Sequence, residues 1–175
     1  MDRKNFIKTT GIGLSLAIIP ALLKSQNLTT NKFDTNNTKP KIIKESEGSI
    51  LNVIGDIQTH KISGEDTNNQ IVEWTNNVAP GIGIPPHIHT KEDEIFRVLE
   101  GEVEVMVDGE STVLKAGDMA FAPKNLVHSW RVVGEKNAKM WVSAFPSGME
   151  FMFHELDALP PGPPDLKKVG EICEK

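Results

Sequence analysis

Cysteine is nearly absent from this sequence: Cys173 is the single cysteine among 175 residues. A lone cysteine cannot form an intrachain disulfide, and it cannot supply the sets of thiolates that hold structural zinc ions. Histidine is also scarce, with five in the whole chain. A site for a first-row metal would therefore combine a few imidazoles with carboxylates.

Basic charge is in the minority, because 19 Lys and Arg residues stand against 24 Asp and Glu residues, for a net charge of −5. No basic stripe is present, so we expect a small-molecule substrate and no nucleic-acid partner. Hydrophobic residues make up 38% of the chain, which is enough for one packed core but not for several membrane spans. The length predicts one domain with additions at its ends.

The N-terminal segment has the three-part order of an export signal. Residues 1–8 are basic, residues 9–23 carry no charge, and a polar stretch follows. The apolar run is too short for a comfortable membrane span, so we expect no stable span in the mature protein. The segment RKNFIK resembles the twin-arginine signal with Lys4 in place of the second arginine, which leaves the twin-arginine and Sec routes open. An N-terminal amphipathic helix or an uncleaved anchor is the alternative.

These features divide the chain into four parts. Residues 1–25 are predicted to be the export signal, and residues 26–48, rich in Asn and Thr, a disordered linker. Residues 49–146 are predicted to form a folded β-domain, and residues 147–175 a helical C-terminal extension. The mature protein is expected to be exported, to the periplasm, and the sequence leaves a homodimer open.

Short apolar runs recur between turn signals through the predicted β-domain. The clearest stretch, EVEVMVDGESTVL, alternates in hydrophobicity and turns on Asp108-Gly109, a dipeptide typical of two-residue hairpins. The nine predicted strands are Ile50–Ile54, Ile57–Ile62, Gln70–Val78, Glu94–Leu99, Glu102–Val107, Glu110–Leu114, Asp118–Ala122, Val127–Val133 and Ala138–Phe145. Strands this short and this closely spaced predict an all-β antiparallel sandwich or barrel.

The C-terminal residues have a different pattern. Met149–Leu159 is predicted to be helical, and the PPGPP segment that follows would end that helix. Asp165 is a predicted N-cap for a second helix. The apolar residues of this second helix fall on one face: Leu166, Val169, Ile172 and Cys173. We expect both helices to cover part of the sheet.

Two of the five histidines lie in the stretch PPHIHTKEDEIF, at Pro85–Phe96. Alternate residues of a strand share a face, so His87 and His89 are predicted to point the same way, into the barrel if Ile88 points out. Glu94 opens the next strand, and His128 lies on a later one. Three imidazoles and one carboxylate make a nitrogen and oxygen set suited to one divalent first-row metal. Solvated loop residues without a metal are the alternative interpretation.

The spacing of these residues resembles the two motifs of the cupin superfamily. The first motif is matched at every fixed position by Gly81-x5-His87-x-His89-x4-Glu94-x6-Gly101. The second is approached by Gly117-x5-Pro123-x-Asn125-x2-His128, with Asn125 where the motif has glycine and Val132 where it ends in asparagine. The resemblance covers roughly residues 50–145. It implies the cupin fold, a double-stranded β-helix or jelly-roll barrel, followed here by a short helical tail.

The chain resembles small single-domain cupins of the Cupin_2 type, and among them the quercetinase-like branch. This likeness depends on PPHIHTKEDEIFRVLEGEVEV, on APKNLVHSW, and on a helical tail after FPSGMEFMF. It implies that His87, His89, Glu94 and His128 hold the metal, whether iron, manganese, nickel, cobalt, copper or zinc. It further implies that Glu94 is catalytic and takes the hydroxyl proton of an enol or phenol that dioxygen then cleaves.

Three functional hypotheses remain open from the sequence. The first is a metal-dependent dioxygenase for a small enolic or phenolic compound. The second is a metal-dependent isomerase or lyase acting on a sugar or uronate, and the third is a non-catalytic binder of a small ligand. Arg97 and Arg131 alternate along their strands with residues predicted to face the pocket, so they are predicted to point away from it. A pocket without these two positive charges favours a neutral substrate.

Most of the remaining aromatic residues are predicted to be packing residues. Phe96 and Trp130 follow metal-ligand candidates on the same strand face, so they are the candidate substrate-binding residues. The other large aromatic side chains are expected in the barrel core: Trp74, Trp141, Phe121 and Phe145. His60 and His154 are expected at the surface.

The export hypothesis predicts that residues 1–25 are absent from the mature protein. Intact-mass spectrometry of protein purified from its native host should give the mass of a chain that begins near residue 26. A chain that keeps Met1 in a soluble cytoplasmic fraction would rule out the signal.

Overall fold

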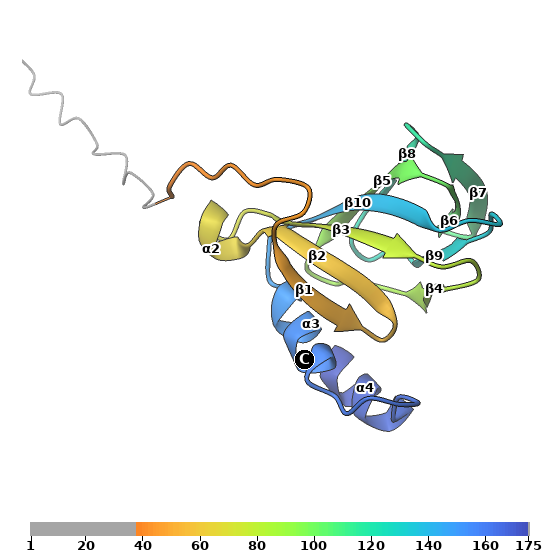
Figure 1. Ribbon diagram of the computed structural model, residues 1–175. Helices are drawn as coiled ribbons and strands as arrows, with labels where there is room; N and C mark the ends of the chain where they lie inside the picture. Colours follow the sequence, from red (N-terminus) through yellow and green to blue (C-terminus); the bar gives the residue numbers. More distant parts are fainter. Residues whose placement is uncertain (1–37, 175) are drawn as a thin grey trace, which may run out of the picture. The chain divides into compact units, whose positions relative to one another are not determined.

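The computed structural model describes residues 38–174. Within these residues, ten strands form two antiparallel sheets, shown in Figure 1. The six-stranded sheet has the order β1 (Ser49–Val53), β2 (Asp56–Ile62), β3 (Val72–Val78), β10 (Ala138–Phe145), β5 (Asp93–Glu100), β8 (Met119–Ala122). The four-stranded sheet has the order β4 (Gly83–His87), β9 (His128–Val132), β6 (Glu102–Val107), β7 (Glu110–Lys115). The all-β prediction is confirmed.

All nine predicted strands are present, but β4 was not among them. Its sequence, GIPPH, contains two prolines, which lack the N–H group that a central strand needs. β4 is an edge strand of its sheet, where proline is tolerated. Its pairing with β9 is irregular between Ile84 and His87. A strand of this composition gives no clear pattern in the sequence.

The predicted hairpin is confirmed. β6 and β7 pair in register from Glu102 and Lys115 to Val107 and Glu110. Asp108 and Gly109 form the two-residue turn, and both have positive φ, at 52° and 84°. Positive φ at both positions is the geometry that makes Asp-Gly a preferred hairpin turn.

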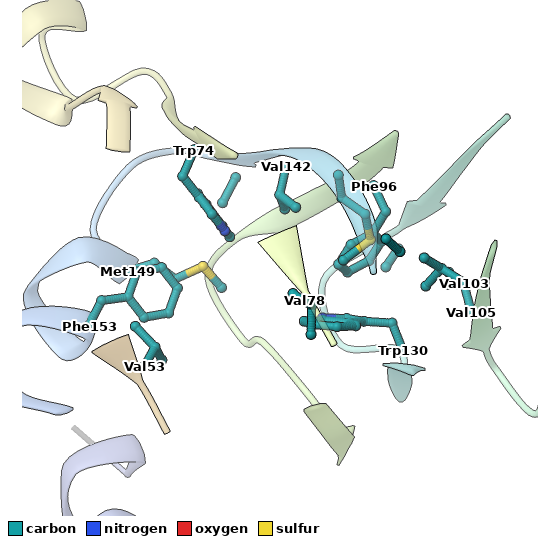
Figure 2. Close-up of a cluster of buried hydrophobic side chains, with 14 of the residues drawn as sticks. Val53, Trp74, Val78, Phe96, Val103, Val105, Trp130, Val142, Met149 and Phe153 are labelled. Carbon is teal, nitrogen blue, oxygen red and sulfur yellow. The ribbon is translucent and has the colours of Figure 1, made fainter. Parts of the chain in front are cut away.

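The core lies between the two sheets, where inward-facing side chains of both pack together (Figure 2). Trp74 belongs to this core, as predicted, and so do the two candidate substrate-binding residues, Phe96 and Trp130. The prediction was wrong for the other aromatic residues. Trp141, Phe145 and Phe121 lie on the outer face of the six-stranded sheet, where Phe121 is 49% exposed. The alternation of residues along a strand shows which side chains share a face of the sheet, but it does not show which face is covered by the rest of the chain.

Short helices complete the chain. α2 (Gly64–Thr67) joins β2 to β3 and is closed by a capping box between Ser63 and Asp66. The predicted C-terminal helices are observed as α3 (Met149–Asp157) and α4 (Leu166–Cys173). Asp165 caps α4, because its carboxylate accepts hydrogen bonds from the backbone N–H groups of Lys167 and Lys168.

The two C-terminal helices differ in how they pack. α3 packs against β1 and buries Met149, Phe153 and Leu156 in the core. α4 packs against α3, and its buried side chain is Ile172. Among residues 38–174, no helix has the length and hydrophobicity that a membrane span requires.

Residues 38–48 contain no helix or strand, but they contact the six-stranded sheet. The buried Lys61 side chain donates hydrogen bonds to the backbone carbonyls of Glu45 and Glu47. Lys139 forms an ion pair with Glu45. The predicted export signal and residues 26–37 of the predicted linker lie outside the described residues.

A polar cluster is buried on the inner face of β2 and β3. Asp56 is 2% exposed, and its carboxylate accepts hydrogen bonds from Gln58 Nε2 at 2.9 Å and Asn76 Nδ2 at 3.0 Å. We call these three residues the Asp56 cluster. Burial raises the pKa of Asp56 from 3.8 to about 6, although the two hydrogen bonds act in the opposite direction.

The raised pKa of Asp56 predicts a pH-dependent stability. Because the folded chain holds the proton more tightly than the unfolded chain, this stabilisation is complete below pH 3.8 and is lost as the pH rises through 6. The Asp56→Asn variant has no carboxyl group at this position, so its stability does not fall in this way as the pH rises. Its free energy of unfolding, relative to wild type, should therefore rise by about 2–3 kcal/mol between pH 4 and pH 7.

Urea unfolding at both pH values measures this difference. Asp108→Asn, at the exposed hairpin turn, is the control and should keep a constant difference from wild type. A constant difference for Asp56→Asn as well would contradict the raised pKa.

Candidate metal centre

Four potential metal-ligating side chains meet between the two sheets. His87 is the last residue of β4, His89 lies in the loop that follows, and His128 is the first residue of β9. Glu94 comes from β5 in the opposite sheet. One potential ligand atom from each of the four side chains lies within 4.8 Å of the others. The structure thus brings together the four residues that the sequence predicted.

Strand pairing explains part of this convergence. His87 and His128 are directly opposite each other in the β4–β9 ladder, and directly opposite side chains of an antiparallel pair lie on the same face of the sheet. Gly83 allows β4 to approach β9 this closely, because a Cβ atom at that position would overlap the carbonyl oxygen of Trp130. The predicted shared strand for His87 and His89 was incorrect, since β4 ends at His87.

The loop that carries His89 is held by the segment before β9. The backbone N–H of Asn125 donates to the carbonyl oxygen of His89 at 2.8 Å. Asn125 has φ of 67°, a left-handed conformation that asparagine adopts more readily than most residues. This explains how asparagine can occupy the position where the cupin motif has glycine.

The ligand atoms point toward one another at short range. His87 Nε2 lies 3.1 Å from His89 Nε2, and His128 Nε2 lies 3.1 Å from Glu94 Oε2. His89 Nε2 is 3.7 Å from the same oxygen of Glu94. Three nitrogens and a carboxylate oxygen therefore surround one point.

Hydrogen bonds on the far side of two imidazoles fix their tautomers. His87 Nδ1 lies 2.8 Å from the carbonyl oxygen of Pro85, and His128 Nδ1 lies 3.1 Å from that of Leu126. A carbonyl oxygen only accepts hydrogen bonds, so each Nδ1 carries the hydrogen and donates. Each Nε2 then keeps its lone pair toward the centre, which is the orientation of a metal-binding histidine.

Burial also sets the charge state of the centre. It lowers the pKa of His87, and it lowers the pKa of His89 to about 3, with the neighbouring imidazoles adding to the effect for His89. For His128, burial lowers the pKa, but the hydrogen bond and the charge of Glu94 outweigh it, so the net direction is upward. Neutral imidazole is the form that binds a metal, so His87 and His89 are ready to ligate at neutral pH.

Glu94 is 5% exposed, and burial raises the pKa of its carboxyl group. The hydrogen bond and charge of His128 act in the opposite direction, while the nearby charge of Asp56 adds to the increase. A buried carboxylate needs a compensating positive charge. A divalent cation among these four side chains would supply that charge, so the residues present fit a metal ion.

The centre opens into a cavity of about 330 Å³. His87, His89 and Glu94 line one part of it, and apolar side chains of both sheets, α3 and α4 line most of the rest. None of the lining residues, all within 38–174, is Lys or Arg. Arg97 and Arg131 are exposed on the outer faces, as predicted, and Arg131 pairs there with Glu104.

The two candidate substrate-binding residues have different positions. Trp130 lines the cavity. Phe96 is fully buried behind His128, with a ring-centroid distance of 6.1 Å, and is not among the lining residues. Trp74 and the Asp56 cluster also line the cavity, although sequence analysis did not select them.

The remaining two histidines also differ. His154 is exposed on α3, as predicted. His60 is not a free surface residue: it stacks on Trp74, contacts Phe153 edge-on, and hydrogen-bonds Gln58 at 2.9 Å.

Known proteins share this domain. The Cupin_2 family, described as "Cupin domain", matches residues 74–145. The pectin degradation protein KdgF of Dickeya dadantii is 30% identical over 97 residues, which cover 51% of this chain and 86% of that protein. The chain belongs to the cupin superfamily. Quercetin 2,3-dioxygenase of Bacillus subtilis is 33% identical to this cupin over 95 residues, but the match covers only 28% of that enzyme.

Solved structures agree with the fold of this cupin. KdgF from a Halomonas species has a TM-score of 0.56 at 19% identity, covering 65% of this chain and 99% of that one. A predicted oxalate decarboxylase from Thermotoga maritima has a TM-score of 0.56 at 24% identity, covering 61% and 99%. At such identities these structures show the shared fold, which confirms the predicted jelly-roll barrel.

The loop position of His89 predicts that it can be removed without loss of the fold. His89→Ala should lower the content of bound metal to background, because a ligand is lost, and should keep a β-type circular dichroism spectrum, because the ten strands stay paired. His154→Ala, on the exposed side of α3, is the control and should keep its metal. Elemental analysis of the purified proteins measures both.

Two results would contradict this account. Wild-type metal content in His89→Ala would place the ion elsewhere. An unfolded metal-free protein would show that the metal, and not strand pairing, maintains the fold.

Proposed function

We propose that this cupin is a metal-dependent dioxygenase acting on a small enolic or phenolic compound. The cavity is the observation that supports this most strongly. Metal-ligating side chains occupy one part of its wall, and most of the remaining wall is apolar and without cationic side chains. Such a cavity suits a flat, mainly apolar molecule that carries an oxygen for the metal.

His87, His89, Glu94 and His128 would hold one divalent first-row metal, a role that fits the donor types and their convergence. The bound metal would supply a Lewis-acidic centre that polarises the substrate oxygen and gives access to dioxygen chemistry. The identity of the metal does not follow from the donor set, since iron, manganese, nickel, cobalt, copper and zinc all accept imidazole and carboxylate.

Glu94 has a second role in this proposal, as the general base. For this role the Glu94 carboxylate would leave the metal; it is buried, and without the metal burial raises the pKa of its carboxyl group. A raised pKa makes a carboxylate a more effective proton acceptor near neutral pH. Glu94 Oε2 lies 3.1 Å from His128 Nε2, so the carboxylate stays beside the ligand set when it accepts the hydroxyl proton.

An isomerase or lyase acting on a sugar or uronate is the second candidate. The likeness to the pectin degradation protein KdgF supports it, because the match covers 86% of that relative. The cavity favours the first candidate, because a uronate carries a negative charge and the lining residues offer no Lys or Arg to pair with it.

An oxygen-uptake screen separates the two candidates. Protein loaded in turn with each of the six metals is mixed with panels of phenols, enols and uronates in an oxygen-electrode cell. We expect substrate-dependent oxygen consumption with a phenol or enol. Conversion of a uronate without oxygen consumption would establish the second candidate, and ligand binding without any conversion would indicate a binding protein.

Glu94→Gln separates the two roles of Glu94. Glutamine keeps the size of the side chain and one acceptor oxygen, so the three imidazoles should retain most of the metal. Turnover should fall by about 10²–10⁴, the usual cost of losing a general base. His87→Ala should lose both metal and turnover.

Glu100→Gln, at the exposed end of the same strand, is the matched control and should behave as wild type. Near-normal turnover by a metal-containing Glu94→Gln variant would show that this carboxylate is not the base.

A further inference from the structure

The cavity has a second polar region apart from the metal ligands. The Asp56 cluster lies on β2 and β3 and lines the same cavity as His87, His89 and Glu94. Its three side chains are almost fully buried. The hydrogen bonds among them do not include the metal-ligand candidates. An apolar cavity with two separate polar regions suits a ligand with a polar group at each end.

The Asp56 carboxylate has capacity for further hydrogen bonds. A carboxylate can accept about four. Residues 38–174 supply two side-chain donors, Gln58 Nε2 and Asn76 Nδ2. Since the group is buried and cavity-lining, the remaining acceptor capacity is best satisfied by a donor within the cavity.

Trp74 provides an independent observation. It lies on β3, two residues from Asn76 and on the same inward face, and its ring points into the interior (Figure 2). The indole Nε1 is buried and has no hydrogen-bond partner among residues 38–174, yet Trp74 lines the cavity. A buried N–H group without an acceptor is unfavourable and uncommon in folded proteins.

We propose that the Asp56 cluster and Trp74 Nε1 bind a hydroxyl group at the distal end of the substrate. A hydroxyl both donates and accepts, so it can donate to the Asp56 carboxylate and accept from Trp74 Nε1. This inference rests on the proposed function, in which the opposite end of the substrate is an enol or phenol oxygen at the metal centre. The substrate class is then a small phenol or enol in which an apolar part of the molecule separates a second hydroxyl from the oxygen at the metal centre.

Strand stabilisation alone does not account for these features. Gln58 and Asn76 are directly opposite in the β2–β3 ladder, and Asn76 Oδ1 accepts from the backbone N–H of Met140 on β10. Those contacts explain why the two amides are buried. They do not explain the unpartnered indole N–H or the unused acceptor capacity of Asp56.

Isothermal titration of the zinc-loaded protein with matched phenols tests the proposal. Zinc has no redox chemistry, so binding is measured without turnover. The probes are 4-ethylphenol and 4-(2-hydroxyethyl)phenol, which differ by one hydroxyl, together with the corresponding pairs that have one-carbon and three-carbon chains. Wild type should bind at least one hydroxylated probe about tenfold more tightly than its partner, the effect of a hydrogen bond to a charged group.

Trp74→Phe and Asp56→Asn should each reduce this preference, measured as the ratio of the two affinities within a pair. Trp74→Phe removes an N–H group without breaking any hydrogen bond in residues 38–174, but the smaller ring leaves space in the core and should lower the thermal stability. The alkylphenol is the internal reference, because a packing defect would weaken both members of a pair equally. Trp141→Phe, on the outer face of the sheet, is the control and should keep the preference.

Each other outcome overturns a definite part of the account. If binding depends on zinc but the two affinities are equal within all three pairs, the distal site is contradicted and the metal-centred function is left intact. A preference for the hydroxylated probe that survives in both variants has the same consequence. If no phenol binds, or if binding is the same without zinc, the proposed function fails and the distal site fails with it.

Discussion

The buried carboxylate of Glu94 is the constraint on which the rest of this structure depends. A carboxylate that is 5% exposed is unfavourable unless positive charge or strong donors surround it. Three imidazoles meet it between the sheets, brought there by the pairing of β4 with β9 and by the loop held at Asn125. Fixed tautomers turn the ring nitrogens inward, and a divalent cation at their common point would complete the balance of charge.

The rest of the molecule shapes the space in front of that centre. α3 and α4 contribute to the walls of the cavity, and the inner faces of both sheets contribute the remainder. The absence of Lys and Arg from the lining residues, which all lie within 38–174, favours a neutral ligand. The Asp56 cluster and Trp74 add a second polar region, so the cavity has features that can orient a ligand as well as hold it.

The sequence predicted the barrel and the four metal-ligand candidates because both follow from local spacing. It failed where the outcome depends on which face of a sheet is covered. Trp141 and Phe121 alternate like core residues but lie on the outer face. Asp56 and Gln58 lie in a polar strand that is typical of a solvated edge, and they are buried because β2 lies between β1 and β3 with its inner face toward the cavity. The packing of His60 was not predicted for a similar reason, because its stacking partner Trp74 lies on the neighbouring strand.

X-ray absorption fine structure at the edge of the bound metal tests the central claim most directly. The account predicts one ion per chain, with a first shell of nitrogen and oxygen at about 2.0–2.2 Å and the multiple-scattering pattern of three imidazoles. His89→Ala protein reconstituted at high metal concentration should lose one imidazole from that pattern. A first shell of oxygen atoms alone, or an imidazole count that the substitution leaves unchanged, would contradict the assignment of His87, His89, Glu94 and His128 as the metal site.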